Sequence, residues 1–86
     1  MRSVVVSKRA AKTLLRMPAN AAARIRAKIF QYAKDPASLA NNVVKLQGRE
    51  GYRLRVGDWR VIFADDGRVM FIERIGPRGG VYDQES

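Results

Sequence analysis

The 86-residue chain contains no cysteine and no histidine. The lack of cysteine excludes disulfides, a thiol nucleophile and thiolate metal sites, and it fits a reducing compartment. The lack of histidine removes the side chain that most often acts as an acid or base near neutral pH, and with it serine–histidine triads and zinc–histidine chemistry. Any catalysis must therefore use Arg, Lys, Tyr, Asp or Glu.

Long apolar runs are also missing. No stretch approaches the roughly 18 residues that a membrane span requires, and no signal-peptide pattern opens the chain. We therefore expect a cytoplasmic protein with no membrane partner. Hydrophobic residues make up 47% of the 86 residues, so we expect one folded domain over residues 1–86.

Acidic residues are scarce. Seventeen Lys and Arg stand against eight Asp and Glu, which gives a net charge of +9 and a pI of about 10.9. A charge of this sign attracts RNA, DNA, anionic lipid or an acidic protein, and a pI above about 9 is typical of nucleic-acid-binding domains. The plain alternative is a basic surface that serves solubility, so the placement of the charges must decide.

The first half of the chain predicts a strand and two helices. Residues 1–6 contain three consecutive valines, which favour a strand. Ser7 is a good N-cap for a helix over residues 8–16, whose apolar side we expect to hold Ala11, Leu14 and Leu15. Pro18 separates it from a second helix over residues 19–34, whose apolar positions keep the three-to-four spacing of one face: Ala22, Ile25, Ile29, Tyr32 and Ala33.

The second half predicts a sheet. A proline at position 36 ends the second helix, and residues 36–42 are expected to form a loop. Residues 43–46 are expected to begin a strand, and three strands are expected over residues 52–56, 59–64 and 68–75. Gly57-Asp58 and Asp66-Gly67 are typical two-residue hairpin connections. The order β-α-α-β-β-β predicts an α+β fold, with a small antiparallel sheet and both helices packed on one face.

The first hairpin predicts an arginine-rich face. A two-residue turn at Gly57-Asp58 places Arg55 directly opposite Arg60, and alternation then puts Arg53, Arg55 and Arg60 on one face. The other face, toward the helices, receives Tyr52, Leu54, Val56, Trp59, Val61 and Phe63. Like charges directly opposite one another destabilise a sheet, and such local conflicts are expected at functional sites. The alternative is a solvated face on which long arginines splay apart.

Three further residues are candidates on the last strand and the tail. A two-residue turn at Asp66-Gly67 would place Glu73 opposite Arg60, where it could orient Arg60, act as a general base or form a plain salt bridge. A longer turn would move Glu73 to the other face. Arg78 follows on a Pro- and Gly-rich turn, and Tyr82 could stack on an RNA base or simply close the sheet edge.

Four segments together resemble the RelE/ParE toxin superfamily, and its RelE branch most closely: Lys45–Gly48, Tyr52–Phe63, Arg74–Arg78 and Val81–Asp83. The resemblance implies a RelE-like fold. It also implies a toxin that cleaves messenger RNA in the ribosomal A site and is neutralised by a cognate antitoxin. RelE-like cleavage uses the 2′-hydroxyl of the RNA and leaves a cyclic phosphate and a 5′-hydroxyl, with no metal or cofactor.

The resemblance also assigns roles. Arg53 and Arg55 fall where RelE has two catalytic lysines, and Arg60 matches the arginine that stabilises the transition state. Arg78 matches the arginine proposed to protonate the leaving oxygen, and Tyr82 the tyrosine that orients the nucleotide. Arginine is a poor proton acceptor near neutral pH. The change from Lys to Arg therefore favours Glu73, Tyr82 or the ribosome itself as the source of the base.

Two other functions fit the same fold. ParE-like members poison DNA gyrase, and fold alone does not separate them from RelE-like members. A non-catalytic basic RNA-binding module, including an inactivated toxin, would bind RNA with a strong salt dependence and would not cut it.

Overall fold

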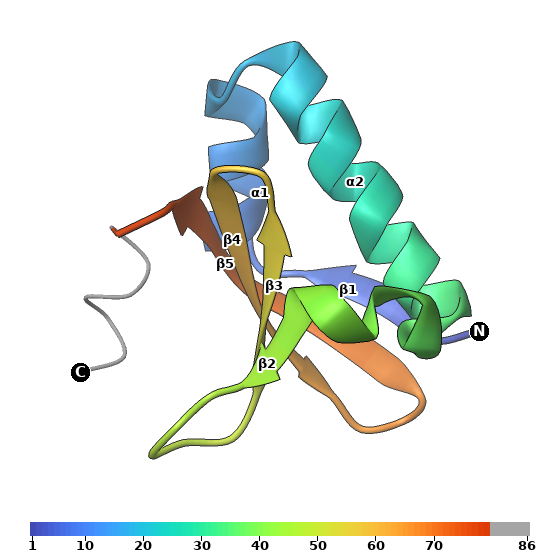
Figure 1. Cartoon of the computed structure of the whole chain (residues 1–86). Coiled ribbons are helices and arrows are strands. Elements are labelled where there is room, and N and C mark those ends of the chain that lie inside the picture. Colours follow the sequence, from blue (N-terminus) through green and yellow to red (C-terminus); the bar gives the residue numbers. More distant parts are fainter. Residues whose placement is uncertain (80–86) are drawn as a thin grey trace.

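The computed structural model describes residues 1–79, within which helices and strands form an α+β fold (Figure 1). The predicted class and the order of the predicted elements are confirmed. The stretch expected as a loop instead forms a short 3₁₀ helix, η1. The elements are β1 (Ser3–Val6), α1 (Lys8–Arg16), α2 (Ala19–Lys34), η1 (Pro36–Asn42), β2 (Val43–Lys45), β3 (Tyr52–Val56), β4 (Trp59–Asp65) and β5 (Val69–Pro77).

Helix α1 begins where the sequence predicts. The Ser7 hydroxyl oxygen accepts a hydrogen bond from the Ala10 amide at 3.0 Å and donates one to the Glu73 carbonyl at 2.8 Å, so the N-cap also ties the helix to β5. Ala10 and Leu14 are buried, whereas Leu15 is exposed. The expectation that Leu15 packs inward is wrong, because it lies about 100° around the helix from Leu14.

Helix α2 supplies much of the core. All five of its predicted apolar positions are buried, and they join the sheet residues in one hydrophobic cluster. The Tyr32 ring meets the Phe63 ring edge-on, with 4.8 Å between centroids. Within residues 1–79 no helix is long and apolar enough to cross a membrane.

The sheet has five strands in the order β1-β5-β4-β3-β2 and is mixed (Figure 1). Strands β2 to β5 form the predicted antiparallel run, but β1 pairs with β5 in parallel. The helical hairpin carries the chain from β1 across one face to the far edge of the sheet. The meander then returns strand by strand until β5 lies beside β1. A prediction from hairpin signals alone could not place β1, because its partner is the last strand.

The β4–β5 connection differs from the two-residue turn predicted for it. Strand β4 ends at Asp65 and β5 begins at Val69, so residues 66–68 form the connection. The Asp66 carboxylate accepts hydrogen bonds from the amides of Arg68 and Val69, both at 2.8 Å. These bonds close a wider loop around the side chain, as aspartate often does in turns.

A β-bulge between Ile62 and Phe63 adds a further shift. Ile62 pairs with Arg74 and Phe63 with Ile72, so Glu73 is the extra residue, and Arg60 pairs with Gly76 instead. The predicted placement of Glu73 opposite Arg60 is therefore wrong. The longer loop and the bulge together account for the difference in register.

Candidate nucleic-acid interface

The β3–β4 hairpin has the predicted register. Val56 pairs with Trp59 and Arg55 with Arg60 across the Gly57-Asp58 turn. Gly57 adopts a φ of +58°, which suits glycine at the first central position of a tight hairpin turn. A side chain at this position would also meet the Arg24 guanidinium, 2.6 Å from an ideal Cβ. The positive φ therefore favours glycine at this position, whereas the flexible Arg24 side chain could move aside.

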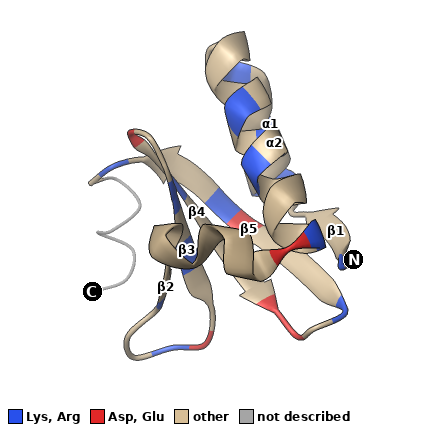
Figure 2. Cartoon of the chain, turned by 45° about the vertical axis from the view of Figure 1, so that its right-hand side comes forward, with Lys and Arg blue, Asp and Glu red and all other residues tan. Residues whose placement is uncertain are grey.

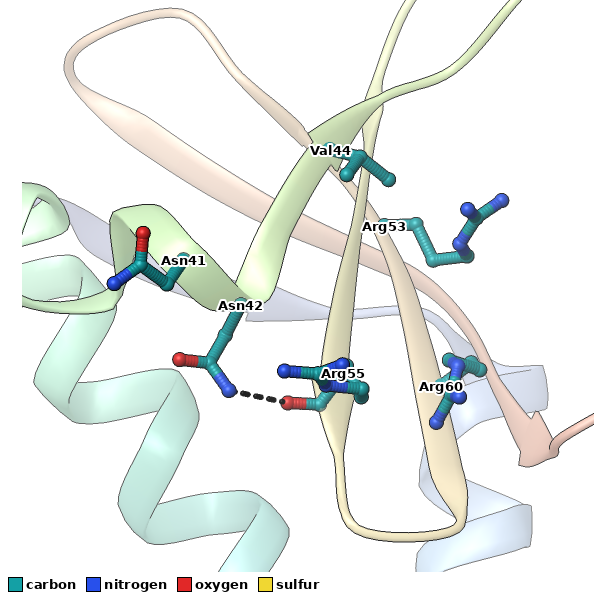
Figure 3. Close-up of a pocket in the computed structure, with 6 residues that line it drawn as sticks. All are labelled: Asn41, Asn42, Val44, Arg53, Arg55 and Arg60. Atoms are coloured by element: carbon teal, nitrogen blue, oxygen red, sulfur yellow. Dashed lines mark hydrogen bonds between the residues drawn. The ribbon is translucent and has the colours of Figure 1, made fainter.

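Three arginines of this hairpin line one open pocket on the sheet face away from the helices (Figure 3). Among the described residues, Arg53, Arg55 and Arg60 supply its cationic side, and Asn41, Asn42 and Val44 also line it. Its volume is about 130 Å³, well below the roughly 300 Å³ at which sites for drug-sized molecules begin. Its size and charge suit a single anionic group such as a phosphate.

The arginines differ in how firmly they are held. Arg60 is 6% exposed, and its Nη1 donates to the carbonyl oxygens of Gly57 at 2.9 Å and Trp59 at 3.0 Å. These carbonyl oxygens fix the orientation of the guanidinium, so the Arg60 side chain is preorganised. Arg55 is exposed and has no carboxylate partner within residues 1–79, so it can move to follow a ligand.

Of the remaining predicted site residues, Arg78 does not line the pocket. Arg78 is exposed on the turn after β5, and its amide donates to the Asp58 carbonyl oxygen at 2.8 Å. This bond places the Arg78 backbone beside the β3–β4 turn, at the Arg60 end of the hairpin. Tyr82 falls outside the described residues.

Glu73 is bound to a different arginine. Nη2 of Arg49, in the β2–β3 loop, lies 2.8 and 2.7 Å from the two Glu73 carboxylate oxygens. Glu73 does not line the arginine pocket. The expected place of Glu73 opposite Arg60, and with it the orienting contact with Arg60, is therefore corrected to an ion pair with Arg49 that joins the β2–β3 loop to β5.

Sequence reasoning missed the amide side of the pocket. Asn41 and Asn42 end η1, which was expected to be a featureless loop, and Val44 lies opposite Arg53 on β2. The Asn42 amide approaches the Arg55 carbonyl oxygen at 3.5 Å (Figure 3). The pairing of β2 with β3 was the available signal, since it brings the residues just before β2 beside the arginines.

A second polar cluster holds the opposite end of the sheet. The Asp65 carboxylate accepts hydrogen bonds from Arg2 Nε at 2.6 Å, Tyr32 Oη at 2.7 Å and the Gly67 amide at 2.9 Å. Burial alone would raise the pKa of Asp65, but these donors and the Arg2 charge outweigh it and lower the pKa. Burial and the bond to Asp65 raise the pKa of Tyr32, which keeps its hydroxyl a donor. This cluster joins the N-terminus, α2 and β4 and has a structural role.

The fold and the pocket together define a small basic α+β protein with an arginine-lined pocket on its sheet. Residues 4–82 match the family model described as the ParE toxin of the type II toxin–antitoxin system parDE. The chain therefore belongs to the RelE/ParE superfamily and is a toxin of the type II toxin–antitoxin class.

Solved structures agree with this assignment. The archaeal RelE–RelB complex from Pyrococcus horikoshii OT3 matches with a TM-score of 0.75 and 28% identity, over 91% of this chain and 96% of that one. The RelB–RelE complex from Methanococcus jannaschii matches with a TM-score of 0.72 and 25% identity, over 95% of this chain and 99% of that one. A doubly substituted E. coli RelE in the free state matches with a TM-score of 0.70 and 20% identity, over 98% of this chain and 93% of that one. At this identity the match supports a shared fold only. A comparison with curated protein sequences finds no significant match.

Proposed function

We propose that this toxin is a metal-independent endoribonuclease that cleaves messenger RNA in the ribosomal A site. The observation that carries the proposal is that Arg53, Arg55 and Arg60 all line one open pocket of phosphate size. Arginine forks match phosphate geometry, and a fold built for stability alone would not place two arginines directly opposite one another.

In the proposed reaction the 2′-oxygen of one nucleotide attacks the adjacent phosphorus and the bond to the 5′-oxygen breaks. The products are a 2′,3′-cyclic phosphate and a 5′-hydroxyl, so the proton lost by the 2′-hydroxyl is balanced by one gained at the leaving oxygen. Arg60, held by two carbonyl groups, stabilises the charge that develops on the non-bridging oxygens. Arg53 and Arg55 hold the same phosphate in place.

The two proton transfers fall to other groups. Arg78 is proposed to protonate the leaving oxygen, because its backbone is bonded to Asp58 of the β3–β4 turn, and Arg60 lies near that turn at the start of β4. Arginines do not accept a proton near neutral pH, and Glu73 is bound to Arg49 outside the pocket. The base for the 2′-hydroxyl is therefore assigned to Tyr82 or to a group of the ribosome. The described residues that line the pocket supply charge but no base, and a base from the ribosome would explain a dependence on the ribosome.

The proposed partner is a cognate antitoxin. Two of the similar structures are complexes of RelE with RelB. A partner of this kind with an acidic segment would neutralise the exposed arginine face. Co-expression with a RelB-like cognate antitoxin should therefore yield a stable complex and remove toxicity.

The test is cleavage on programmed ribosomes, mapped by primer extension with and without a chelator. We expect cuts within the A-site codon that persist in chelator. Arg55→Ala should lower the cleavage rate at least about tenfold by removing a phosphate contact, and Arg68→Ala, an exposed arginine in the β4–β5 loop, is the matched control. Equal rates for both variants would remove the pocket from the mechanism.

A second candidate function is poisoning of DNA gyrase, favoured by the ParE description of the matching family model. Absence of ribosomal cuts, with inhibition in a supercoiling assay by the same folded protein, would support it. RNA binding with neither activity would instead indicate a non-catalytic basic module.

A further inference from the structure

The positive charge of the chain is unevenly distributed. Residues 8–34, the helical hairpin, carry eight Lys and Arg and no Asp or Glu, whereas residues 43–86 carry eight Lys and Arg and seven Asp and Glu. Figure 2 shows blue bands along the helices without red ones between them. Nearly all of the net charge therefore comes from the half of the molecule that does not contain the arginine pocket.

On α1 the cations form a single stripe. Lys8, Arg9, Lys12 and Arg16 are all exposed, and at about 100° per residue they fall within an arc of about 100°. This arc lies opposite the buried face of the helix. Within residues 1–79 none of the four forms an ion pair with a carboxylate. We call these four residues the α1 stripe.

Local energetics oppose this arrangement. Lys8 and Lys12, and Lys12 and Arg16, are like charges four residues apart on one helix, which is destabilising. The first turn of α1 contains no acidic residue, so Lys8 and Arg9 also lie at the positive end of the helix dipole. A sequence shaped only by folding would place Asp or Glu in the first turn. Conflicts of this kind point to a binding role.

We propose that the α1 stripe docks the toxin onto the phosphate backbone of a folded RNA, as a second contact separate from the arginine pocket. The assignment of RNA rests on the proposed function. Cations four residues apart repeat about every 6 Å along a helix, and such a row can bind successive phosphates without reading bases.

The position of the stripe favours a folded RNA over a single strand. The stripe faces away from the core on the helical side, and the pocket opens on the other face of the sheet. The molecule measures 29 × 28 × 24 Å, so the sheet and the helical layer separate the two surfaces. A short strand held in the pocket does not also run along α1, whereas a folded RNA that surrounds the toxin contacts both.

The experiment compares two triple variants with equal loss of charge. The stripe variant is Lys8→Gln/Lys12→Gln/Arg16→Gln, and the control is Arg26→Gln/Lys34→Gln/Arg68→Gln, three cations that are also exposed. Binding to isolated small ribosomal subunits is measured at several salt concentrations. The stripe variant should bind at least about tenfold more weakly, with a salt slope smaller by about two to three. In the control variant, the loss of binding affinity should be less than a third of the loss in the stripe variant. The thermal midpoint of the stripe variant should not fall, because like-charge contacts are removed.

Three outcomes overturn the proposal. Equal weakening in both variants would assign the effect to net charge, and unchanged binding by the stripe variant would remove α1 from the contact. Intact binding to subunits with lost binding to the co-expressed antitoxin would make the stripe a protein interface. Cleavage by the unaltered toxin is measured in a separate assay. If the toxin binds RNA through the α1 stripe but makes no cuts, the nuclease proposal is contradicted and the docking proposal is retained.

Discussion

The two faces of the β3–β4 hairpin are built from alternating residues of the same short segment, yet one face packs in the core and the other lines a pocket. One face places Leu54, Val61 and Phe63, all 0% exposed, in the core. The other presents Arg53, Arg55 and Arg60 to an open pocket. Because the period of a strand is two residues, one hairpin can hold the fold with one face and bind a ligand with the other. Substitutions on the two faces should therefore separate stability from activity.

The largest expected effect is on the core face. Phe63 is fully buried, and its ring lies 4.8 Å from that of Tyr32 and 5.5 Å from that of Tyr52. Phe63→Ala should lower the free energy of unfolding by about 3–5 kcal/mol, which is much of the stability of a small domain. Chemical denaturation measures it. Phe71→Ala, on the same sheet but 37% exposed, should cost below about 1 kcal/mol, and equal losses would contradict the division between faces.

The next effect is on the arginine face. Arg60→Lys keeps the charge but loses the planar fork that Gly57 and Trp59 orient. We expect cleavage on programmed ribosomes to fall about 100-fold, as when one preorganised transition-state donor is removed, while RNA binding changes little. Arg68→Lys is the control for the same exchange at an exposed site. A fully active Arg60→Lys would show that charge alone suffices.

A substitution in the Asp65 cluster should affect stability at the opposite end of the same sheet. Asp65→Asn keeps the shape but removes the charge that accepts hydrogen bonds from Arg2, Tyr32 and Gly67. The free energy of unfolding should fall by about 1–3 kcal/mol. The pocket lies elsewhere, so the cleavage rate of the folded variant should match that of the wild type. A drop in rate without a drop in stability would contradict the structural role.

The same cluster predicts a pH dependence. The pKa of folded Asp65 is lowered from the ordinary value of 3.8, so its contribution to stability is fully present above that value. The contribution is lost as pH falls below 3.8 and through the lower pKa of the folded state. Unfolding midpoints measured between pH 3 and pH 6 should therefore fall less steeply with acid in Asp65→Asn than in the wild type. Parallel curves would show that Asp65 does not control the acid response.

The smallest effect is expected at Glu73. Its ion pair with Arg49 is about one third exposed on each side, and such pairs contribute below about 1 kcal/mol. Glu73→Gln should change the free energy of unfolding by less than that and leave cleavage unaltered. A large loss of cleavage with normal folding would restore Glu73 as the base.

Much of the fold could be predicted because its signals are local. Ser7 caps α1, the five apolar positions of α2 are buried, and Gly57 sets the register that gathers the arginines. The second hairpin could not be predicted in the same way. The Asp66 side chain widens the turn, and the bulge adds one residue to β5. Both features depend on the backbone hydrogen bonds that form only when the strands of the sheet pair.

The sequence by itself determined the charge, the elements and the arginine face, because composition, helical periodicity and strand alternation act over a few neighbouring residues. Only the tertiary structure decided the partners of distant groups. It brought β1 beside β5, Asn41 and Asn42 beside the arginines, and Arg49 onto Glu73. These contacts join residues far apart in the chain, so they are set by how the helical hairpin and the sheet pack together and not by local preference.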